Sequence, residues 1–258
     1  MAGKKRIDVL LVDRGLAGSR SQAQKLIMAG LVRVEGQLIH KASQKAAPGA
    51  MIEVATGPRF VSRGGEKLQA AMEKFPVTVE DKVCADVGAS TGGFTDCLLK
   101  NGAASVFSID VGKGQLHWKL RNDNRVVVIE KTNARYLEKL PERVLFVTMD
   151  VSFISLRKIL PVILGWLDPG GDVIALIKPQ FEAGPAHVGK GGVVRDSTVH
   201  RDVCQQILEF SDEHSLAPQE LIRSPLIGPK GNVEFLAWLQ KDGPTRNVED
   251  MLVGIFPS

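Results

Sequence analysis

The chain has 258 residues, of which 44% are hydrophobic and 24% are charged, and its formal net charge is +4. This composition is typical of a globular protein, and the length allows a well-buried core plus one small additional domain. The longest apolar stretch, near residues 159–167, is far short of the roughly 20 residues that span a bilayer, and no signal segment opens the chain. These features argue against a membrane partner and predict a cytoplasmic protein.

The first 60 residues are predicted to form a compact basic module. Apolar residues over 7–12 form one helical face, and Ser19 is placed to cap a second helix from Arg20 to Met28. Alternating residues predict strands near 31–37 and 51–54. This part carries ten Lys and Arg residues and four acids, a net charge of +6, whereas the rest of the chain carries −2. The asymmetry favours a polyanion-binding module joined to a domain with another task.

After a predicted linker over residues 59–65, the chain alternates between helix and strand patterns, starting with a helix from about 66 to 74. Strands are expected at 83–87, 105–110, 126–130, 144–149 and 172–177, and helices near 93–101, 115–121 and 154–165. Such alternation predicts an α/β fold with a Rossmann-like, doubly wound and mostly parallel sheet. Closing strands at 221–222 and 234–239 are expected to add an antiparallel edge strand, and residues 243–258 form a weakly specified tail.

The most informative stretch of this second domain runs from Asp86 to Phe94. It lies between a short apolar strand and a helix, so its backbone can approach a nucleotide-like ligand. A dinucleotide fingerprint needs G-x-G-x-x-G, but the second glycine position holds Ser90. The pattern D-x-G-x-x-x-G-G is more typical of an S-adenosylmethionine (SAM) site, and an ordinary tight turn is the simpler alternative. The predicted cofactor-binding residues of this turn are Asp86, Gly88, Ser90, Thr91, Gly92, Gly93 and Phe94.

Polar residues at the ends of later strands extend this predicted site. Asp110 follows the second strand about 20 residues after the turn, where an acid binds ribose hydroxyls in dinucleotide-binding folds. Asn133 follows the third strand and is the predicted adenine contact. Asp150 and Lys178 end the next two strands. Because ligand chemistry gathers at the carboxyl ends of parallel strands, these two residues are expected to meet in one crevice.

Asp150 and Lys178 have two interpretations. A partly desolvated lysine can have its pKa lowered enough to act as a base, which would make the pair catalytic. The alternative is a structural ion pair without a chemical role. Asp150 is also a predicted cofactor contact.

The N-terminal module, residues 1–58, resembles the S4 (S-four) RNA-binding domain over residues 6–54. The resemblance is carried by Arg6-Ile7-Asp8, Leu16 to Ala23, Ile27, Gly30 to Gly36 and Lys41. It implies that RNA is bound by exposed cations, several of them on the second helix. The residues predicted to bind RNA in this module are Arg6, Arg20, Gln24, Lys25, Arg33 and Lys41.

Four charged residues give the second domain, residues 66–242, a family resemblance as well. They are Lys67 in S-R-G-G-E-K-L, Asp150 in M-D-V-S-F-I-S, Lys178 in I-K-P-Q-F-E and Glu234 in G-N-V-E-F-L. In this order they resemble the catalytic tetrad of FtsJ-like ribose 2′-O-methyltransferases. With the S4-like module, the chain resembles the TlyA family, often labelled hemolysin A. This resemblance implies a SAM-dependent methyltransferase that modifies a cytidine 2′-hydroxyl of ribosomal RNA.

The resemblance also implies a role for each of the four residues. Lys178 would assist deprotonation of the 2′-hydroxyl or stabilise the developing alkoxide. Asp150 and Glu234 would hold the two lysines in place. Lys67 would orient the hydroxyl or a neighbouring phosphate.

One further glycine-rich segment, residues 184–191, matches G-x-x-x-x-G-K but has Gly191 where a P-loop needs Ser or Thr. We interpret it as a flexible lid in which Lys190 contacts RNA phosphate. Arg63, just before the first helix of the second domain, is a further predicted RNA contact.

The remaining cysteines, histidines and tryptophans have simpler interpretations. Cys84, Cys97 and Cys204 are widely spaced and are expected to be buried, reduced thiols. The five histidines have no metal-ligand spacing, so no metal site is expected. The three tryptophans lie in apolar patterns and are expected in the core; they are Trp118, Trp166 and Trp238.

The sequence therefore predicts a SAM-dependent rRNA (cytidine-2′-O)-methyltransferase whose partners are ribosomal RNA or ribosomal subunits. Two alternatives belong to other classes: an RNA-binding protein that has lost its catalytic activity, and a membrane-active hemolysin, which only the family label suggests. A pseudouridine synthase is disfavoured, because the glycine-rich turn has no role in that chemistry.

Overall fold

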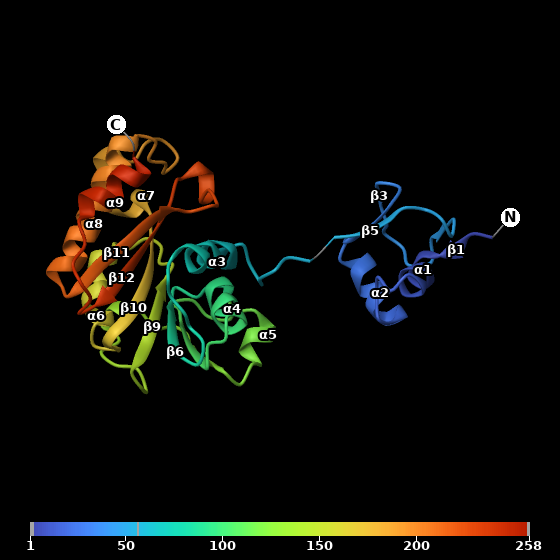
Figure 1. Cartoon of the computed structure of the whole chain (residues 1–258), viewed down its shortest axis with the longest axis horizontal. Helices are drawn as coiled ribbons and strands as arrows, with labels where there is room; N and C mark the ends of the chain where they lie inside the picture. Colours follow the sequence, from blue (N-terminus) through green and yellow to red (C-terminus); the bar gives the residue numbers. More distant parts are fainter. Residues whose placement is uncertain (1–2, 56, 257–258) are drawn as a thin grey trace. The chain divides into compact units, whose positions relative to one another are not determined.

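The computed structural model describes residues 3–55 and 57–256, and the chain divides into two compact units between Arg59 and Phe60 (Figure 1). Each unit has its own apolar core. Within the described residues, no helix is long and apolar enough to cross a membrane.

The N-terminal unit packs two helices against short strands. Helices α1 (Ile7–Asp13) and α2 (Arg20–Met28) share an apolar core with the strands. Ser19 caps α2, since its side chain accepts a hydrogen bond of 3.2 Å from the Gln22 amide. Two antiparallel groups of strands complete the unit: β1 (Lys5–Arg6) with β4 (Lys45–Ala46), and β2 (Val32–Val34) between β3 (Gln37–Leu38) and β5 (Ile52–Val54).

The second unit is built on one seven-stranded sheet with the order β11-β12-β10-β9-β6-β7-β8. The strands are β6 (Val83–Val87), β7 (Ser105–Ile109), β8 (Val126–Ile129), β9 (Val144–Met149), β10 (Leu167–Ile177), β11 (Leu216–Arg223) and β12 (Phe235–Lys241). Strands β8, β7, β6, β9 and β10 pair in parallel, and β12 is antiparallel to both β10 and β11. The mostly parallel, Rossmann-like sheet is confirmed, and the antiparallel strand lies one place in from the edge because β11 pairs outside it.

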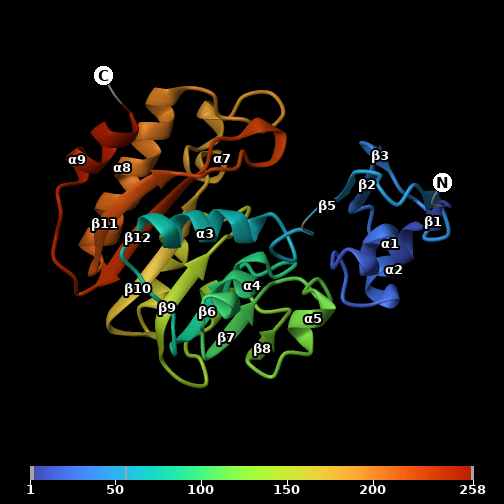
Figure 2. The same ribbon diagram turned by 45° about the vertical axis from the view of Figure 1, so that its right-hand side comes forward.

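Helices cover both faces of this sheet (Figure 2). One face packs against α3 (Gly64–Lys74), α4 (Gly93–Lys100) and the short α5 (Trp118–Arg121). The other packs against α6 (Leu160–Ile163), α8 (Ser197–Glu213) and α9 (Val248–Ile255). Neighbouring residues of the central strand β9 alternate between the two cores: Phe146 faces the first and Val147 the second. Because β6 to β10 are parallel, their carboxyl ends meet at one edge, where a site can form.

Several segments differ from the sequence-based expectations. Phe60 is 2% exposed and belongs to the core beside α3, so residues 60–65 are part of the second unit rather than a free linker. The predicted tail contains α9, whose buried Leu252 lies in the same core as α8. The helix expected at 154–165 is reduced to a 3₁₀ turn (Leu156–Lys158) and α6, which has a proline in its first turn.

The buried cysteines are confirmed, but only two of the tryptophans lie in the core. Trp166 and Trp238 are 1% and 6% exposed, whereas Trp118 is 65% exposed. All three cysteines are buried. Burial raises the pKa of the Cys84 thiol to about 12, so this thiol stays protonated and unreactive at neutral pH.

Candidate active site

The glycine-rich turn between β6 and α4 brings three segments close together. Gly88 has a φ of +84°, and a side chain there would lie 2.7 Å from the Asp150 carbonyl oxygen. A side chain at Gly93 would lie 2.8 Å from the Gly65 amide nitrogen. Both glycines therefore permit backbone contacts, one with the end of β9 and one with the start of α3. The second contact fixes the helix turn that carries Lys67.

Ser90 occupies the position where a dinucleotide fingerprint has glycine, and its backbone keeps the left-handed conformation. Its φ is +49°, a region that glycine adopts without strain. The Ser90 amide donates a 2.8 Å hydrogen bond to Asp110 Oδ2, which holds the turn in this conformation. Asp110 Oδ1 accepts a second bond of 2.6 Å from the Gly112 amide. The Asp110 carboxylate therefore joins the ends of β6 and β7 and keeps further lone pairs for a ligand.

A cavity of about 640 Å³ lies over the carboxyl ends of β6 to β9. Five of the residues predicted to bind the cofactor line it: Gly88, Ser90, Asp110, Asn133 and Asp150. Apolar side chains form much of the remaining wall; they are Val87, Ile109, Val111, Phe153, Ile154 and Ile159. An acid for hydroxyl groups, an amide and apolar walls for a ring fit an adenosine-containing cofactor.

Asp86 is not on the wall of this cavity, contrary to its predicted role in cofactor binding. Its side chain is fully buried, and it accepts hydrogen bonds from Thr95 Oγ1 at 2.6 Å and Thr148 Oγ1 at 3.0 Å. Gly92 also lies away from the cavity, where a side chain would collide with Leu116 and Leu120. Asp86 and Gly92 therefore support the turn from the protein interior and do not face the cavity.

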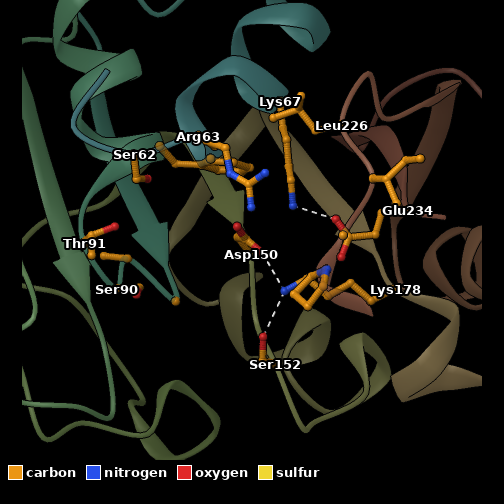
Figure 3. Close-up of a pocket in the computed structure, with 18 residues that line it drawn as sticks. Ser62, Arg63, Lys67, Ser90, Thr91, Asp150, Ser152, Lys178, Leu226 and Glu234 are labelled. Atoms are coloured by element: carbon orange, nitrogen blue, oxygen red, sulfur yellow. Dashed lines mark hydrogen bonds and ion pairs between the residues drawn. The ribbon is translucent and has the colours of Figure 1, made fainter. Parts of the chain in front are cut away.

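A second cavity of about 400 Å³ adjoins the first, and all four predicted catalytic residues line it (Figure 3). Lys178 Nζ lies 2.6 Å from Asp150 Oδ1 and donates a 3.0 Å hydrogen bond to Ser152 Oγ. Lys67 Nζ lies 2.6 Å from Glu234 Oε2. Asp150, Ser152, Gly88 and Ser90 line both cavities, so the first ion pair lies at their junction.

The Lys67–Glu234 pair is the more deeply buried one. The Glu234 side chain is fully buried and that of Lys67 is 12% exposed. Glu234 Oε1 has no hydrogen-bond partner among the described residues. Gly228 lies against this carboxylate, where a side chain would collide with it. Glu234 Oε1 is thus an available hydrogen-bond acceptor in the wall of the second cavity, beside the ammonium group of Lys67.

Ser152 and Glu182 support the site and were not predicted from the sequence. Glu182, in α7 (Pro179–Glu182), accepts hydrogen bonds of 2.6 Å from Ser155 Oγ and 2.7 Å from the Leu156 amide. Burial raises the pKa of the Glu182 carboxyl despite these bonds. Glu182 thereby ties the loop after Asp150 to the helix after Lys178. No local pattern marks such a bond, because it joins residues 26 or more positions apart.

The residues predicted to bind RNA fall into two groups. Arg6, Arg20 and Gln24 all donate hydrogen bonds to the buried carboxylate of Asp8, at 2.9–3.1 Å. The bond from Arg6 is the main reason that the pKa of Asp8 is well below its usual range. Both arginine side chains stay exposed, at 41% and 56%, so Asp8 fixes them without covering them.

The other predicted RNA contacts are exposed. Lys25, Arg33 and Lys41 lie on the surface of the N-terminal unit, and Lys190 lies in an exposed turn of the second unit. Arg63 lines the second cavity, into which its guanidinium points (Figure 3). The structure therefore brings Arg63 to the tetrad, whereas Lys190 lies outside the cavity lining.

Two family models match the chain: FtsJ-like methyltransferase over residues 60–241 and S4 domain over residues 5–52. The 16S/23S rRNA (cytidine-2′-O)-methyltransferase TlyA of Mycobacterium tuberculosis is 46% identical over 244 residues, 93% of this chain and 91% of that protein. Hemolysin A of Brachyspira hyodysenteriae is 43% identical over 238 residues, 90% of this chain and 98% of that protein. A solved structure from Streptococcus thermophilus is 42% identical, covers 97% of this chain and 95% of that chain, and has a TM-score of 0.73.

Replacing Asp86 with Asn tests its interior position. Burial raises the pKa of the Asp86 carboxyl to about 6, above the usual value of about 3.9, so the folded state binds this proton more tightly than the unfolded state. Relative to Asp86→Asn, the wild type should lose about 3 kcal/mol of unfolding free energy as the pH rises from about 4 to 7. Urea unfolding at a series of pH values measures the difference, and parallel pH profiles of the two proteins would contradict this position.

Proposed function

This chain belongs to the TlyA family of FtsJ-like methyltransferases, and we propose that it transfers the methyl group of SAM to a cytidine ribose 2′-hydroxyl of ribosomal RNA. The observation that carries the proposal is the pair of lysine–carboxylate contacts in one cavity, with Asp150 at the junction to the nucleoside cavity. The methyl group of SAM held in the first cavity and a ribose 2′-hydroxyl held in the second would meet beside Lys178.

The first cavity suits SAM by the chemistry of its walls. SAM, when bound, supplies a methyl group on a sulfonium, which is already electrophilic. Asp110 would bind the ribose hydroxyls, and Asn133 with the apolar wall would hold the adenine ring. The left-handed turn at Gly88 and Ser90 would let the backbone approach the amino-acid end of SAM.

The tetrad would orient the acceptor and stabilise the charge that develops on it. In the transfer, the 2′-oxygen would bond to the methyl carbon as the bond from that carbon to sulfur breaks, leaving the neutral thioether, and the hydroxyl proton would pass to water. Lys178 would stabilise the negative charge that develops on the oxygen. Asp150 and Ser152 hold the Lys178 ammonium in place by direct contacts. Lys67, fixed by Glu234, would hold the hydroxyl or the adjacent phosphate in line for attack.

We assign RNA binding and methyl transfer to different units of the chain. The N-terminal unit would bind the RNA through the cations fixed by Asp8 and through exposed Lys25, Arg33 and Lys41, and the unit that begins at Phe60 would carry out the transfer. Ribosomal subunits are the proposed substrates, and the cytoplasm, where ribosomes are assembled, is the proposed location. The hemolysin name belongs to a relative, and the complete tetrad favours an enzyme over an inactive RNA-binding protein.

Lys178→Ala tests the catalytic role. We expect transfer to rRNA to fall at least about 100-fold, the contribution of a well-placed proton-transfer or charge-stabilising group, while SAM affinity by calorimetry changes little. A matched control is Lys82→Ala, because Lys82 also pairs with an aspartate, Asp172 at 3.4 Å, far from both cavities. Activity of Lys178→Ala equal to that of Lys82→Ala would contradict the assignment.

Charge reversal at two exposed lysines tests the RNA-binding role of the N-terminal unit. The variant Lys25→Glu with Lys41→Glu should bind rRNA more weakly. The logarithm of its RNA affinity should also fall less steeply with the logarithm of the salt concentration, by about 1 in slope for each phosphate that the variant no longer neutralises. SAM affinity should not change. The control is Lys74→Glu, an exposed lysine at the end of α3. An equal decrease of RNA affinity in the control would show that net charge alone is responsible.

A further inference from the structure

Trp118, the first residue of α5, is an exposed tryptophan. Its exposed fraction is 65%, against 1% for Trp166 and 6% for Trp238. A tryptophan buries a large apolar surface when it joins a core or an interface, so leaving its ring in water forgoes that stabilisation. Because tryptophan is enriched at interfaces, the ring is a candidate contact for a partner, and its surroundings show which kind of partner fits.

The backbone around Trp118 is rigidly anchored, so its exposure is not a consequence of a loose loop. Leu116 and Leu120, on either side in the sequence, are 6% and 4% exposed and lie in the core with α3 and α4. They pack where a side chain at Gly92 would otherwise be. The His117 amide donates a 3.1 Å hydrogen bond to the Thr91 carbonyl oxygen. Because Thr91 lines the second cavity, this bond ties the backbone next to Trp118 to a segment of that cavity.

The surroundings of Trp118 are cationic. Lys113 and Lys119 are exposed, and neither has a carboxylate within ion-pair distance among the described residues. The two acids of the following segment, Asp123 and Glu130, are already paired with Arg125 and Arg121. The charge available to a partner is therefore positive, which favours a polyanion over an acidic or neutral protein surface.

We propose that Trp118 stacks on an unpaired base of the substrate RNA near the target nucleotide, with Lys113 and Lys119 contacting adjacent phosphates. An aromatic side chain with exposed lysines close to it in the chain is the combination by which proteins bind single-stranded nucleic acid. The neighbouring His117 ring lies 5.9 Å away and is inclined by 29° to Trp118, and the exposed surface of Trp118 is available to a base. The inference rests on RNA being the substrate and adds a contact made by the methyltransferase unit itself.

Trp118→Ala and Trp118→Phe, in the full chain, test this contact. With rRNA as the probe, Trp118→Ala should weaken RNA affinity roughly 5- to 100-fold, the range for removal of one base–aromatic stack, and Trp118→Phe should retain most of the affinity. SAM affinity and the rate at saturating RNA should stay within about twofold of the wild type. Leu145→Ala is the matched control, because Leu145 is a 40% exposed apolar residue on β9. Equal RNA affinity in Trp118→Ala and this control would overturn the proposal.

Fluorescence gives a readout that does not depend on methyl transfer. The emission of the exposed Trp118 should be quenched by rRNA in the wild type, and this quenching should be absent in Trp118→Phe. Quenching without any methyl transfer would support the stack and overturn the proposed function instead. Methyl transfer without quenching, or self-association of the wild type that Trp118→Ala abolishes, would overturn the stack and assign the ring to a protein interface.

Discussion

The contact between Lys178 and Asp150 depends on two parallel strands that are neighbours in the sheet. β9 and β10 end at the same edge, with Ala175 opposite Met149, so the residues that follow the two strands meet there. The 2.6 Å ion pair is therefore a product of strand register, and a slip of one residue would turn every side chain of a strand to the other face. The same edge also carries the glycine-rich turn at the end of β6 and Asp110 at the end of β7. One geometrical constraint thus assembles both cavities.

The second lysine–carboxylate pair explains why the antiparallel strand is part of the site. Lys67 and Glu234 are 167 residues apart, on α3 and just before β12. A buried carboxylate without a partner is strongly unfavourable, so the two residues stabilise each other only when α3 and β12 are both in place. Because Gly93 permits the close approach of α3, the glycine-rich turn is also needed for the tetrad. The cofactor site and the catalytic site are consequently not independent parts of the fold.

Local patterns in the sequence predicted the strands and placed Asp150 and Lys178 at the ends of two of them, whereas Lys67 and Glu234 were identified only through the family resemblance, and the burial of side chains was not predicted. The apolar runs before Asp150 and Lys178 indicate central strands, and the carboxyl ends of those strands indicate where the site lies. Asp86 is predicted to bind the ligand because it lies near the end of β6, yet its oxygens accept hydrogen bonds from Thr95, in the helix that follows, and from Thr148, 62 positions away. Trp118 lies among apolar residues, but only Leu116 and Leu120 face the core. Helix α8 has a recognisable signal, since Asp196 caps it, but the predicted alternation did not include it.

The central claim is that the reaction takes place on a ribose oxygen of cytidine, and the product of the reaction tests it most directly. rRNA incubated with the full chain and methyl-labelled SAM can be digested to nucleosides and separated by liquid chromatography with mass detection. The account predicts label in 2′-O-methylcytidine, and none when Asp150 is replaced by Asn. Label in a base-methylated nucleoside, or equal labelling by the Asp150→Asn variant, would contradict it.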